Sequence, residues 1–564
     1  MTWSQGALAL APGSDVSSGF VAYNIADLYE HTADLVADRE VLVVGDERRT
    51  FRELEERANQ LGHHLIASGI GPGDHIGIYG ANSVEWIEAA LAAYKVRAVP
   101  VNVNYRYVEE ELTYLFDNAD LKALVYDRAM SPRIDAVRGS LPLLQHLVHI
   151  EDGSQEAPAQ GSVGFEDALA GQSTERDFGP RRDDDHYIIY TGGTTGMPKG
   201  VIWRHEDVFF ALGGGIDAYT NERVADEWTL AKKAASVESG MTSLNLPPLM
   251  HGAAQWGLWR FAFEGNRVVF LGRQFDPAEV WRTIAREGVN TVSITGDAMA
   301  RPMIEALAEL ERSGEQLDLS SMFVLASTAA IFSPTVKDRY LERFPDLMII
   351  DAIGSSETGS NGMRMVGKGD TQNTGGGPTV QAARDAVVLD EDLNELEPGS
   401  GQQGRLARRG NVPLAYHKDP EKSAATFVTG PTGTRYALAG DMAILEADGT
   451  ITLLGRGSQC INSGGEKIFP EEVEAALKAH PEVFDAVVVG VPDERWGQRV
   501  AAVVQPRPGA APTLDALDAH CRGYLAGYKV PKEVHLVPEV VRSPSGKPDY
   551  PWAAQVALTN QPVQ

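Results

Sequence analysis

The sequence predicts an α/β fold with a large N-terminal part of mostly parallel sheets, a β subdomain, and a small α+β C-terminal domain. Three observations support this prediction. The chain has 564 residues, too many for one ordinary core, so two to four domains are expected. Its first half alternates helical and strand patterns. After about residue 381 the pattern changes to short strands and turns, and a compact mixed unit follows residue 455.

The alternation in the first half indicates βα units. Residues 51–68 place apolar side chains on one helical face, and residues 84–94 form a second helical pattern. Short apolar runs at 75–79 and 98–103 predict strands between and after these helices. Strands that alternate with helices favour parallel sheets. The strand pattern resumes at 267–270, 289–294 and 323–325.

The second half predicts a different architecture. A helix is expected to begin at Pro470, because proline and acidic residues suit a first turn. We place a domain boundary near 455–460. The strands expected before it are 386–389, 404–407, 443–445 and 450–453, and the later elements are a strand at 484–491, a helix at 514–525 and a strand at 533–537.

Composition excludes several classes of partner. The formal net charge is −28, with 78 acidic and 50 basic residues, which argues against binding to nucleic acid or to an anionic membrane surface. No run of 18 apolar residues predicts a transmembrane segment. Of the two cysteines, Cys521 falls on an apolar helical stripe, so we expect a core residue, no disulfide and a cytoplasmic location.

The most informative motif is the run from Tyr190 to Gly200. It holds four glycines, three threonines and one lysine after a predicted strand at 186–190. Glycines let backbone N–H groups approach phosphate oxygens closely. The run is not a P-loop, because Pro198 precedes Lys199 and disfavours a helical start. The alternative is a surface loop without a ligand.

Two further motifs suit a nucleotide. In the run 354–359, Glu357 stands among hydroxyl groups and glycines, which suits Mg²⁺ bound together with phosphates. Asp441 follows Gly440 in a predicted turn, and Arg456 comes fifteen residues later; an aspartate there can accept hydrogen bonds from ribose hydroxyls. Taken alone, each could be an ordinary polar turn.

Two last candidates could face a cleft. Lys547 ends a Pro/Gly-containing loop, where it could project a charge into a cleft or remain in solvent. His251 follows Pro247 and Pro248 and could be structural, a gate or a general base. The general base is the least favoured of the three, since no carboxylate stands near it in the sequence.

These five sites, in this order and spacing, resemble the adenylate-forming superfamily of acyl-CoA synthetases, adenylation domains and luciferases. The resemblance runs from about Asp27 to Tyr550. It implies a large AMP-binding domain at 1–457 that includes the β subdomain at 381–454, a hinge near 458, and a small mobile domain at 459–564. The sequence departs from the superfamily pattern at Ser458, Ile353 and Ala439, and none of these positions removes a charged catalytic group.

The resemblance also assigns roles. Lys547 would be the catalytic lysine, Glu357 and Thr195 would hold Mg²⁺, and His251 would lie between the acyl pocket and the thiol channel. The predicted ATP and coenzyme A contacts are Thr191, Gly192, Gly193, Thr194, Thr195, Gly196 and Lys199 at the triphosphate; Ser327, Thr328, Ala329, Asp351, Ala352 and Ile353 beside adenine, completed by Gly354, Ser355 and Ser356; Asp441 and Arg456 at the ribose; and Gly464 and Gly465 toward pantetheine.

The implied reaction joins a small-molecule carboxylic acid to CoA through an acyl-AMP. Stretches at 203–207, 295–302, 327–330, 354–359 and 461–467 resemble bacterial synthetases for steroid side-chain acids. Small residues at 252–254, 296 and 298 would leave room for a bulky apolar acid. Medium- or long-chain fatty acids are the alternative. Delivery to a carrier protein is less favoured, because no carrier domain follows Lys547, and a homodimer is left open.

Overall fold

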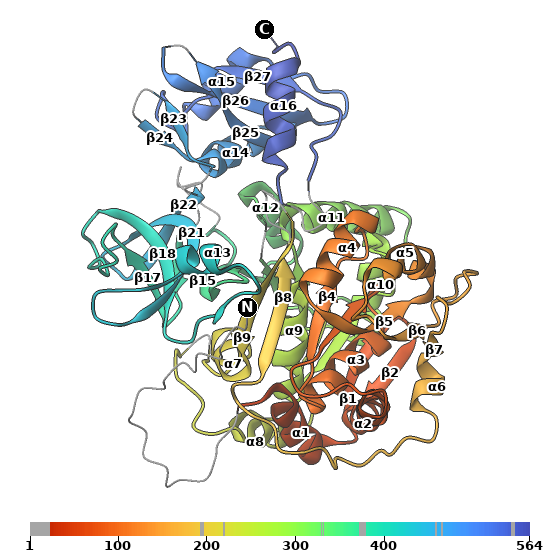
Figure 1. The fold of residues 1–564 in the computed structure, drawn as a ribbon. Helices are drawn as coiled ribbons and strands as arrows, with labels where there is room; N and C mark the ends of the chain where they lie inside the picture. Colours follow the sequence, from red (N-terminus) through yellow and green to blue (C-terminus); the bar gives the residue numbers. More distant parts are fainter. Residues whose placement is uncertain are drawn as a thin grey trace.

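The computed structural model describes residues 23–191, 197–217, 220–328, 330, 332–370, 379–456, 459–463, 466–493, 495–542 and 547–563. Within these residues the chain forms three sheets and their covering helices. Two sheets belong to the large N-terminal part, and the third forms a small C-terminal unit that Figure 1 draws above it. The predicted α/β class is confirmed.

One sheet follows the strand order β19-β9-β8-β4-β3-β5-β6-β7 and is parallel from β8 to β7. The helix predicted at 51–68 begins at a capping box, in which Thr50 Oγ1 and the Glu53 carboxylate each accept the other residue's backbone N–H. The strands are β3 His75–Tyr79, β4 Val99–Val103, β5 Leu121–Asp127, β6 His146–Ile150, β7 Val163–Gly164, β8 His186–Thr191, β9 Lys199–Arg204 and β19 Ala415–Tyr416. The helices are α1 Ile25–Val36, α2 Phe51–Ala67, α3 Val84–Lys95, α4 Glu109–Asn118, α5 Ser131–Val137, α6 Phe165–Leu169 and α7 His205–Leu212.

The largest sheet changes character along its width. Its parallel part runs β1-β11-β10-β12-β13-β14, and from β15 onward the pairing is antiparallel. The strands expected in a β subdomain are present, and they continue this sheet through the β16–β22 pair. The strands are β1 Glu40–Val44, β2 Glu47–Thr50, β10 Thr242–Asn245, β11 Arg267–Phe270, β12 Thr291–Ile294, β13 Val324–Ser327, β14 Met348–Ser355, β15 Gly359–Val366, β16 Thr379–Ala382, β17 Ala386–Leu389, β18 Gln403–Arg409, β20 Phe427–Thr429, β21 Arg435–Leu445 and β22 Thr450–Arg456. The helices are α8 Thr229–Ala235, α9 Gly252–Phe263, α10 Pro277–Glu287, α11 Gly296–Arg312, α12 Pro334–Arg343 and α13 Pro420–Thr426.

The C-terminal unit is a sheet buried on both faces. Alternate residues of its longest strand enter two separate hydrophobic clusters, one toward α14 and α15 and one toward α16. The helix predicted at Pro470 is confirmed, with proline in its first turn, and the helix expected at 514–525 ends at Cys521. The elements are β23 Ile461–Ser463, β24 Glu466–Ile468, β25 Val483–Asp493, β26 Gly497–Pro506, β27 Glu533–Leu536, α14 Pro470–Lys478, α15 Leu514–Cys521 and α16 Tyr550–Thr559.

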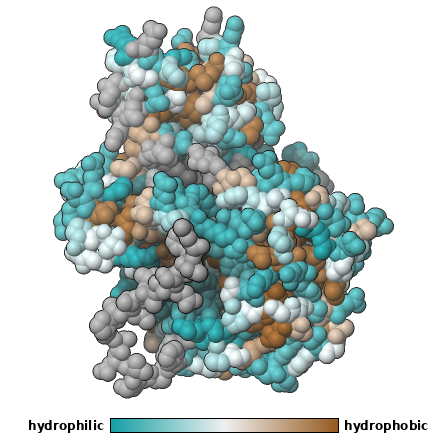
Figure 2. All heavy atoms as spheres, in the orientation of Figure 1, coloured by the Kyte–Doolittle hydropathy of each residue, from teal (hydrophilic) through white to brown (hydrophobic). Residues whose placement is uncertain are grey.

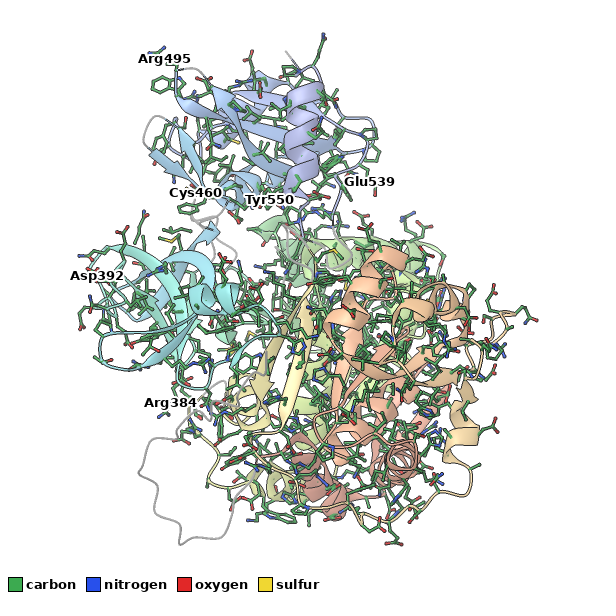
Figure 3. The ribbon with its side chains drawn as sticks, viewed as in Figure 1. Arg384, Asp392, Cys460, Arg495, Glu539 and Tyr550 are labelled. Atoms are coloured by element: carbon green, nitrogen blue, oxygen red, sulfur yellow. The ribbon has the colours of Figure 1, made fainter. Side chains whose placement is uncertain are left out.

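The surface agrees with the composition. Hydrophilic residues dominate much of the face drawn in Figure 2, and within the described chain no helix is long and apolar enough to cross a membrane. Cys521 is buried, as its place on the apolar stripe predicts, while Cys460 is partly exposed at the base of the C-terminal unit (Figure 3). Neither cysteine forms a disulfide within the described chain.

Candidate active site

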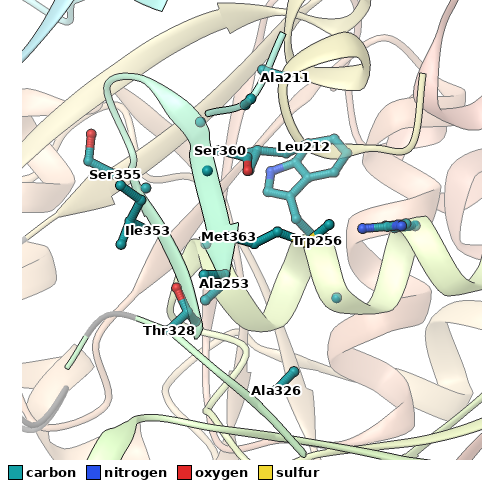
Figure 4. Close-up of a pocket in the computed structure, with 18 of the residues that line it drawn as sticks. Ala211, Leu212, Ala253, Trp256, Ala326, Thr328, Ile353, Ser355, Ser360 and Met363 are labelled. Atoms are coloured by element: carbon teal, nitrogen blue, oxygen red, sulfur yellow. The ribbon is translucent and has the colours of Figure 1, made fainter. Parts of the chain in front are cut away.

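A cavity of about 1610 Å³ collects residues from segments far apart in the sequence. Its walls come from β8, from α9 and from one face of β12 to β14, and Lys547 of the C-terminal unit reaches it as well. Figure 4 shows part of it, with Thr328, Ile353 and Ser355 beside the wall formed by α9. The predicted site residues that line it are Thr191, His251, Thr328, Ala352, Ile353, Gly354, Ser355, Ser356, Glu357 and Lys547.

The predicted phosphate loop joins two antiparallel strands. Tyr190 of β8 pairs with Gly200 of β9, and Thr191 pairs with Lys199. The absence of a helix after this loop agrees with the argument from Pro198. Gly200 is required by close packing, because an ideal Cβ there would lie 2.7 Å from the Tyr190 ring. Gly192, Gly193, Thr194, Thr195 and Gly196 lie outside the described residues.

Lys199 lies beside the cavity and is not part of its lining. Its Nζ pairs with Asp419 Oδ2 at 2.5 Å and stands 5.9 Å from the centre of the Tyr416 ring. Asp419 therefore balances the charge of Lys199 in this arrangement. The predicted contact of Lys199 with a triphosphate stays a prediction.

The run 354–359 is a tight connection between β14 and β15. The Ser355 hydroxyl contacts the Thr358 hydroxyl at 3.0 Å and accepts the Thr358 N–H at 3.1 Å. The Trp203 indole donates to the Ser356 carbonyl at 2.9 Å. An ideal Cβ on Gly354 would lie 2.4 Å from the Gly359 carbonyl oxygen, so only glycine fits there. These contacts fix the backbone that presents Glu357.

Glu357 lines the cavity and accepts one hydrogen bond from the described residues. The Tyr416 hydroxyl donates to its Oε1 at 2.9 Å. Burial, reinforced by this carboxylate, raises the pKa of Tyr416, so the hydroxyl stays a donor. Within the described chain the second carboxylate oxygen accepts no hydrogen bond. That chain also holds no group of three metal-ligating side chains, and a single carboxylate beside a phosphate site is a donor set that suits Mg²⁺.

Two of the residues predicted to lie beside adenine, Ser327 and Asp351, have partners within the protein, and their contact with adenine stays a prediction. The Ser327 hydroxyl accepts the Gly296 N–H at 3.0 Å at the start of α11. The Asp351 carboxylate pairs with Lys337, and burial raises the pKa of Asp351 despite that partner. Neither lines the cavity, in contrast to Thr328, Ala352 and Ile353, and Ala329 lies outside the described residues.

The expected turn at Asp441 is wrong, because this residue lies inside β21. The strand stays continuous through glycines with positive φ, +80° at Gly440 and +116° at Gly455 in the facing strand, and through a bulge next to Met442. Asp441 and Arg456 are nevertheless paired across the two strands. Neither is part of the cavity lining, and the side chain of Arg456 lies outside the described residues.

His251 and Lys547 approach the same end of the cavity. Burial, helped by the charges of Lys547 and Arg106, lowers the pKa of His251 to about 4. Its Nε2 is buried and has no hydrogen-bond partner in the described chain. The imidazole is therefore neutral near pH 7, and its low pKa makes it a poor general base. Residues 543–546, Gly464 and Gly465 lie outside the described residues.

Several residues of the site belong to none of the sequence motifs. Tyr416 and Asp419 contact Glu357 and Lys199, and Trp256 and Arg260 line the cavity. The sequence gives no signal for the first two, because they reach the site only when β19 pairs with β9. For Trp256 and Arg260, the helical spacing after His251 indicates that both lie on the same side of one helix.

Comparison with known proteins decides the family. The family model described as "AMP-binding enzyme" matches residues 29–414. A second model, "AMP-binding enzyme C-terminal domain", matches residues 472–547. The chain belongs to the AMP-binding enzyme family. The predicted resemblance to the adenylate-forming superfamily is thereby confirmed.

Relatives cover nearly the whole chain of this AMP-binding enzyme. It is 53% identical to a 3-oxocholest-4-en-26-oate–CoA ligase of Rhodococcus rhodochrous over 94% of this chain and 96% of that protein. It is 52% identical to a medium/long-chain-fatty-acid–CoA/3-oxocholest-4-en-26-oate–CoA ligase of Mycolicibacterium smegmatis, over 95% and 97%. These names agree with the predicted resemblance to synthetases for steroid side-chain acids.

Solved structures share the fold. The anthranilate CoA ligase AuaEII in complex with anthranoyl-AMP superposes with a TM-score of 0.78 at 24% identity, over 94% of this chain and 96% of that one. ATP-bound MatB from Rhodopseudomonas palustris gives a TM-score of 0.78 at 22% identity, over 94% and 98%. At such identities the structural similarity supports the fold alone, which is a large N-terminal part with a small C-terminal domain.

Proposed function

We propose that this protein is an ATP-dependent acid–CoA ligase that converts a steroid side-chain carboxylic acid to its acyl-CoA through an acyl-AMP. The observation that carries the proposal is one large cavity lined by Glu357, by Lys547 and by one face of α9. The names of the relatives at 52–53% identity support the substrate class.

In the first half-reaction, the substrate carboxylate attacks the α-phosphorus of ATP and pyrophosphate leaves. Carboxylate is a weak nucleophile, so the enzyme contributes mainly position and charge neutralisation. Lys547 would stabilise the charge that develops on the phosphate oxygens. Mg²⁺, held by Glu357 and Thr195, would neutralise phosphate charge when bound. Asp441 and Arg456 are proposed to hold the ribose.

In the second half-reaction, the CoA thiol attacks the acyl carbonyl, the thioester forms, and AMP leaves. We assign residues 459–564 to a mobile domain that turns about a hinge near 458 against the domain at 1–457. This rotation would withdraw Lys547 and bring Gly464 and Gly465 toward the pantetheine arm. One cavity would then serve both half-reactions.

A panel of acids tests the substrate class. CoA-dependent AMP formation is measured with 3-oxocholest-4-en-26-oate, octanoate and palmitate at matched ATP and Mg²⁺. We expect the highest kcat/KM with the steroid acid. A higher kcat/KM with octanoate or palmitate would favour the second candidate, a medium/long-chain fatty acyl-CoA synthetase, which the name of the Mycolicibacterium relative supports.

The same assay tests delivery to a carrier protein. Acid-dependent exchange of pyrophosphate into ATP without any acyl-CoA product would contradict free CoA as the acceptor. A cytoplasmic location and a homodimer stay predictions.

A further inference from the structure

Helix α9 forms one long wall of the cavity. Residues at i, i+1, i+4, i+5, i+8 and i+9 share one side of a helix, and this is the set that faces the cavity. The helix begins next to His251, close to Lys547, and at a rise of 1.5 Å per residue Arg260 lies about 14 Å along the axis from His251. The lining residues of this wall are Gly252, Ala253, Trp256, Gly257, Arg260, Phe261 and, just beyond the helix, Glu264.

Arg260 is the charged residue in an apolar stretch of that helix. Figure 4 shows the apolar part, where Trp256 and Ala253 project from α9 toward Met363. Farther along, the Arg260 stem packs near Gly214, since an ideal Cβ on Gly214 would lie 3.5 Å from Arg260 Cγ. A guanidinium carries five N–H donors and no acceptor.

The Arg260 side chain is 36% exposed, so part of its guanidinium is open to the cavity that it lines. Its Nε is buried and makes no hydrogen bond within the described chain, and the carboxylate paired with it, Glu264 Oε1, stands 3.5 Å away. The other oxygen of Glu264 accepts from the Asn266 amide at 3.2 Å. Lys233 of α8, a helix that contacts α9, lines the cavity as well.

Two carboxylates, Glu264 and Asp217, line the cavity together with these two cationic side chains, so the open donors of Arg260 are the feature available to a ligand. A ligand that covers them must supply an acceptor, because a donor buried without a partner is costly. The methyl end of a fatty acid cannot do so. An acid whose remote end carries an oxygen can.

We propose that Arg260 binds the ketone oxygen at the ring end of a steroid acid, remote from the reacting carboxylate, and thereby selects 3-oxo steroid acids over simple fatty acids. This inference rests on the proposed function and names a specificity-determining residue for it. Arg260 contacts a part of the substrate that does not react, so it acts on substrate affinity and not on the chemical step.

The test compares wild type with Arg260→Met, which keeps the apolar stem and removes every donor. The substrates are 3-oxocholest-4-en-26-oate, the same acid without its 3-oxo group, and palmitate. A hydrogen bond from a charged donor predicts a loss in kcat/KM of roughly tenfold to a hundredfold for the 3-oxo acid, seen in KM with kcat unchanged. The other two acids should change by less than about twofold, and Arg260→Lys should restore part of the loss.

Arg522→Met is the matched control. Arg522 forms the same kind of i,i+4 ion pair with Asp518, beside α15 in the C-terminal unit and outside the cavity lining. We expect this variant to behave as wild type with all three acids.

Three outcomes would overturn the inference: equal losses with all three acids in Arg260→Met, no loss with the 3-oxo acid, or a wild-type enzyme that does not distinguish the two steroid acids. The last comparison needs no variant, so it stands even if Arg260→Met fails to fold. If wild type forms no acyl-CoA from any acid, the proposed function fails instead.

Discussion

The two ends of the cavity are built differently. At the reaction end, short connections from both large sheets converge, and hydrogen bonds hold them, such as Tyr416 to Glu357 and Trp203 to Ser356. At the acyl end, one face of α9 supplies small and apolar side chains, and Arg260 is the charged residue on the helix. The difference separates two tasks: the reaction end holds the groups needed for any acid, and the acyl end selects which acid fits.

The largest effect is expected at the reaction end. Lys547→Ala should lower acid-dependent pyrophosphate exchange about a hundredfold or more, because it removes a charge aimed at the developing phosphate charge. Thioester formation from supplied acyl-AMP and CoA should stay within about threefold of wild type. A loss of both half-reactions to the same extent would contradict the assigned role.

Variants of Glu357 and Tyr416 distinguish the residue proposed to bind Mg²⁺ from the residue that donates a hydrogen bond to it. Glu357→Gln should weaken adenylation by roughly tenfold to a hundredfold and raise the Mg²⁺ concentration needed for half-maximal rate, since a neutral amide is a poorer ligand. Tyr416→Phe removes the 2.9 Å hydrogen bond to Glu357 Oε1 and keeps the aromatic ring, so it should shift the Mg²⁺ dependence in the same direction by up to about tenfold.

The control for the Glu357→Gln and Tyr416→Phe variants is the preference of each for one acid over another. Both variants should keep the wild-type ratio of kcat/KM between 3-oxocholest-4-en-26-oate and palmitate. A changed ratio would show that the two ends of the cavity are coupled.

A smaller effect is expected where the C-terminal unit meets the large part. The Arg301 guanidinium stands 5.0 Å from the centre of the Phe484 ring, and its side chain is only 3% exposed. This cation–π contact belongs to the arrangement that brings Lys547 to the cavity. Arg301→Met should therefore slow adenylation about twofold to tenfold and leave thioester formation from acyl-AMP unchanged.

Arg301 also pairs with Asp297, so the ring must be tested separately. Phe484→Leu and the double variant complete a double-mutant cycle. If the effects of Arg301→Met and Phe484→Leu simply add, the contact does not support adenylation.

Sequence predicted the reaction end better than the acyl end, for a physical reason. Close backbone approach requires glycine at Gly354 and Gly200, so the reaction-end loops stand out as glycine-rich runs next to apolar strands. The strands and helices from residue 51 to residue 103 are likewise predicted by the sequence, because α2 buries one regular face and β3 and β4 are short apolar runs buried along their length.

The remaining features depend on pairing between distant segments. The bulge that keeps Asp441 inside β21 needs the facing Gly455, and Tyr416 reaches Glu357 only through the pairing of β19 with β9. Arg260 stands in an ordinary amphipathic position. Its place in the cavity wall and its Nε without a hydrogen bond in the described chain become evident only from the structure.

The smallest effect is expected from His251. Its pKa of about 4 lies below the ordinary 6.5, so the neutral form persists through pH 5.5–8, and its contribution to stability is lost as pH falls from 6.5 toward 4. The rate of pyrophosphate exchange should therefore follow the same pH profile near pH 6.5 in wild type and in His251→Gln. That variant should adenylate within about threefold of wild type. If wild type shows an inflection near pH 6.5 and His251→Gln lacks it, His251 acts as a base.

In Lys547→Ala, the absence of a nearby positive charge should move the pKa of His251 upward, which a histidine NMR titration would detect.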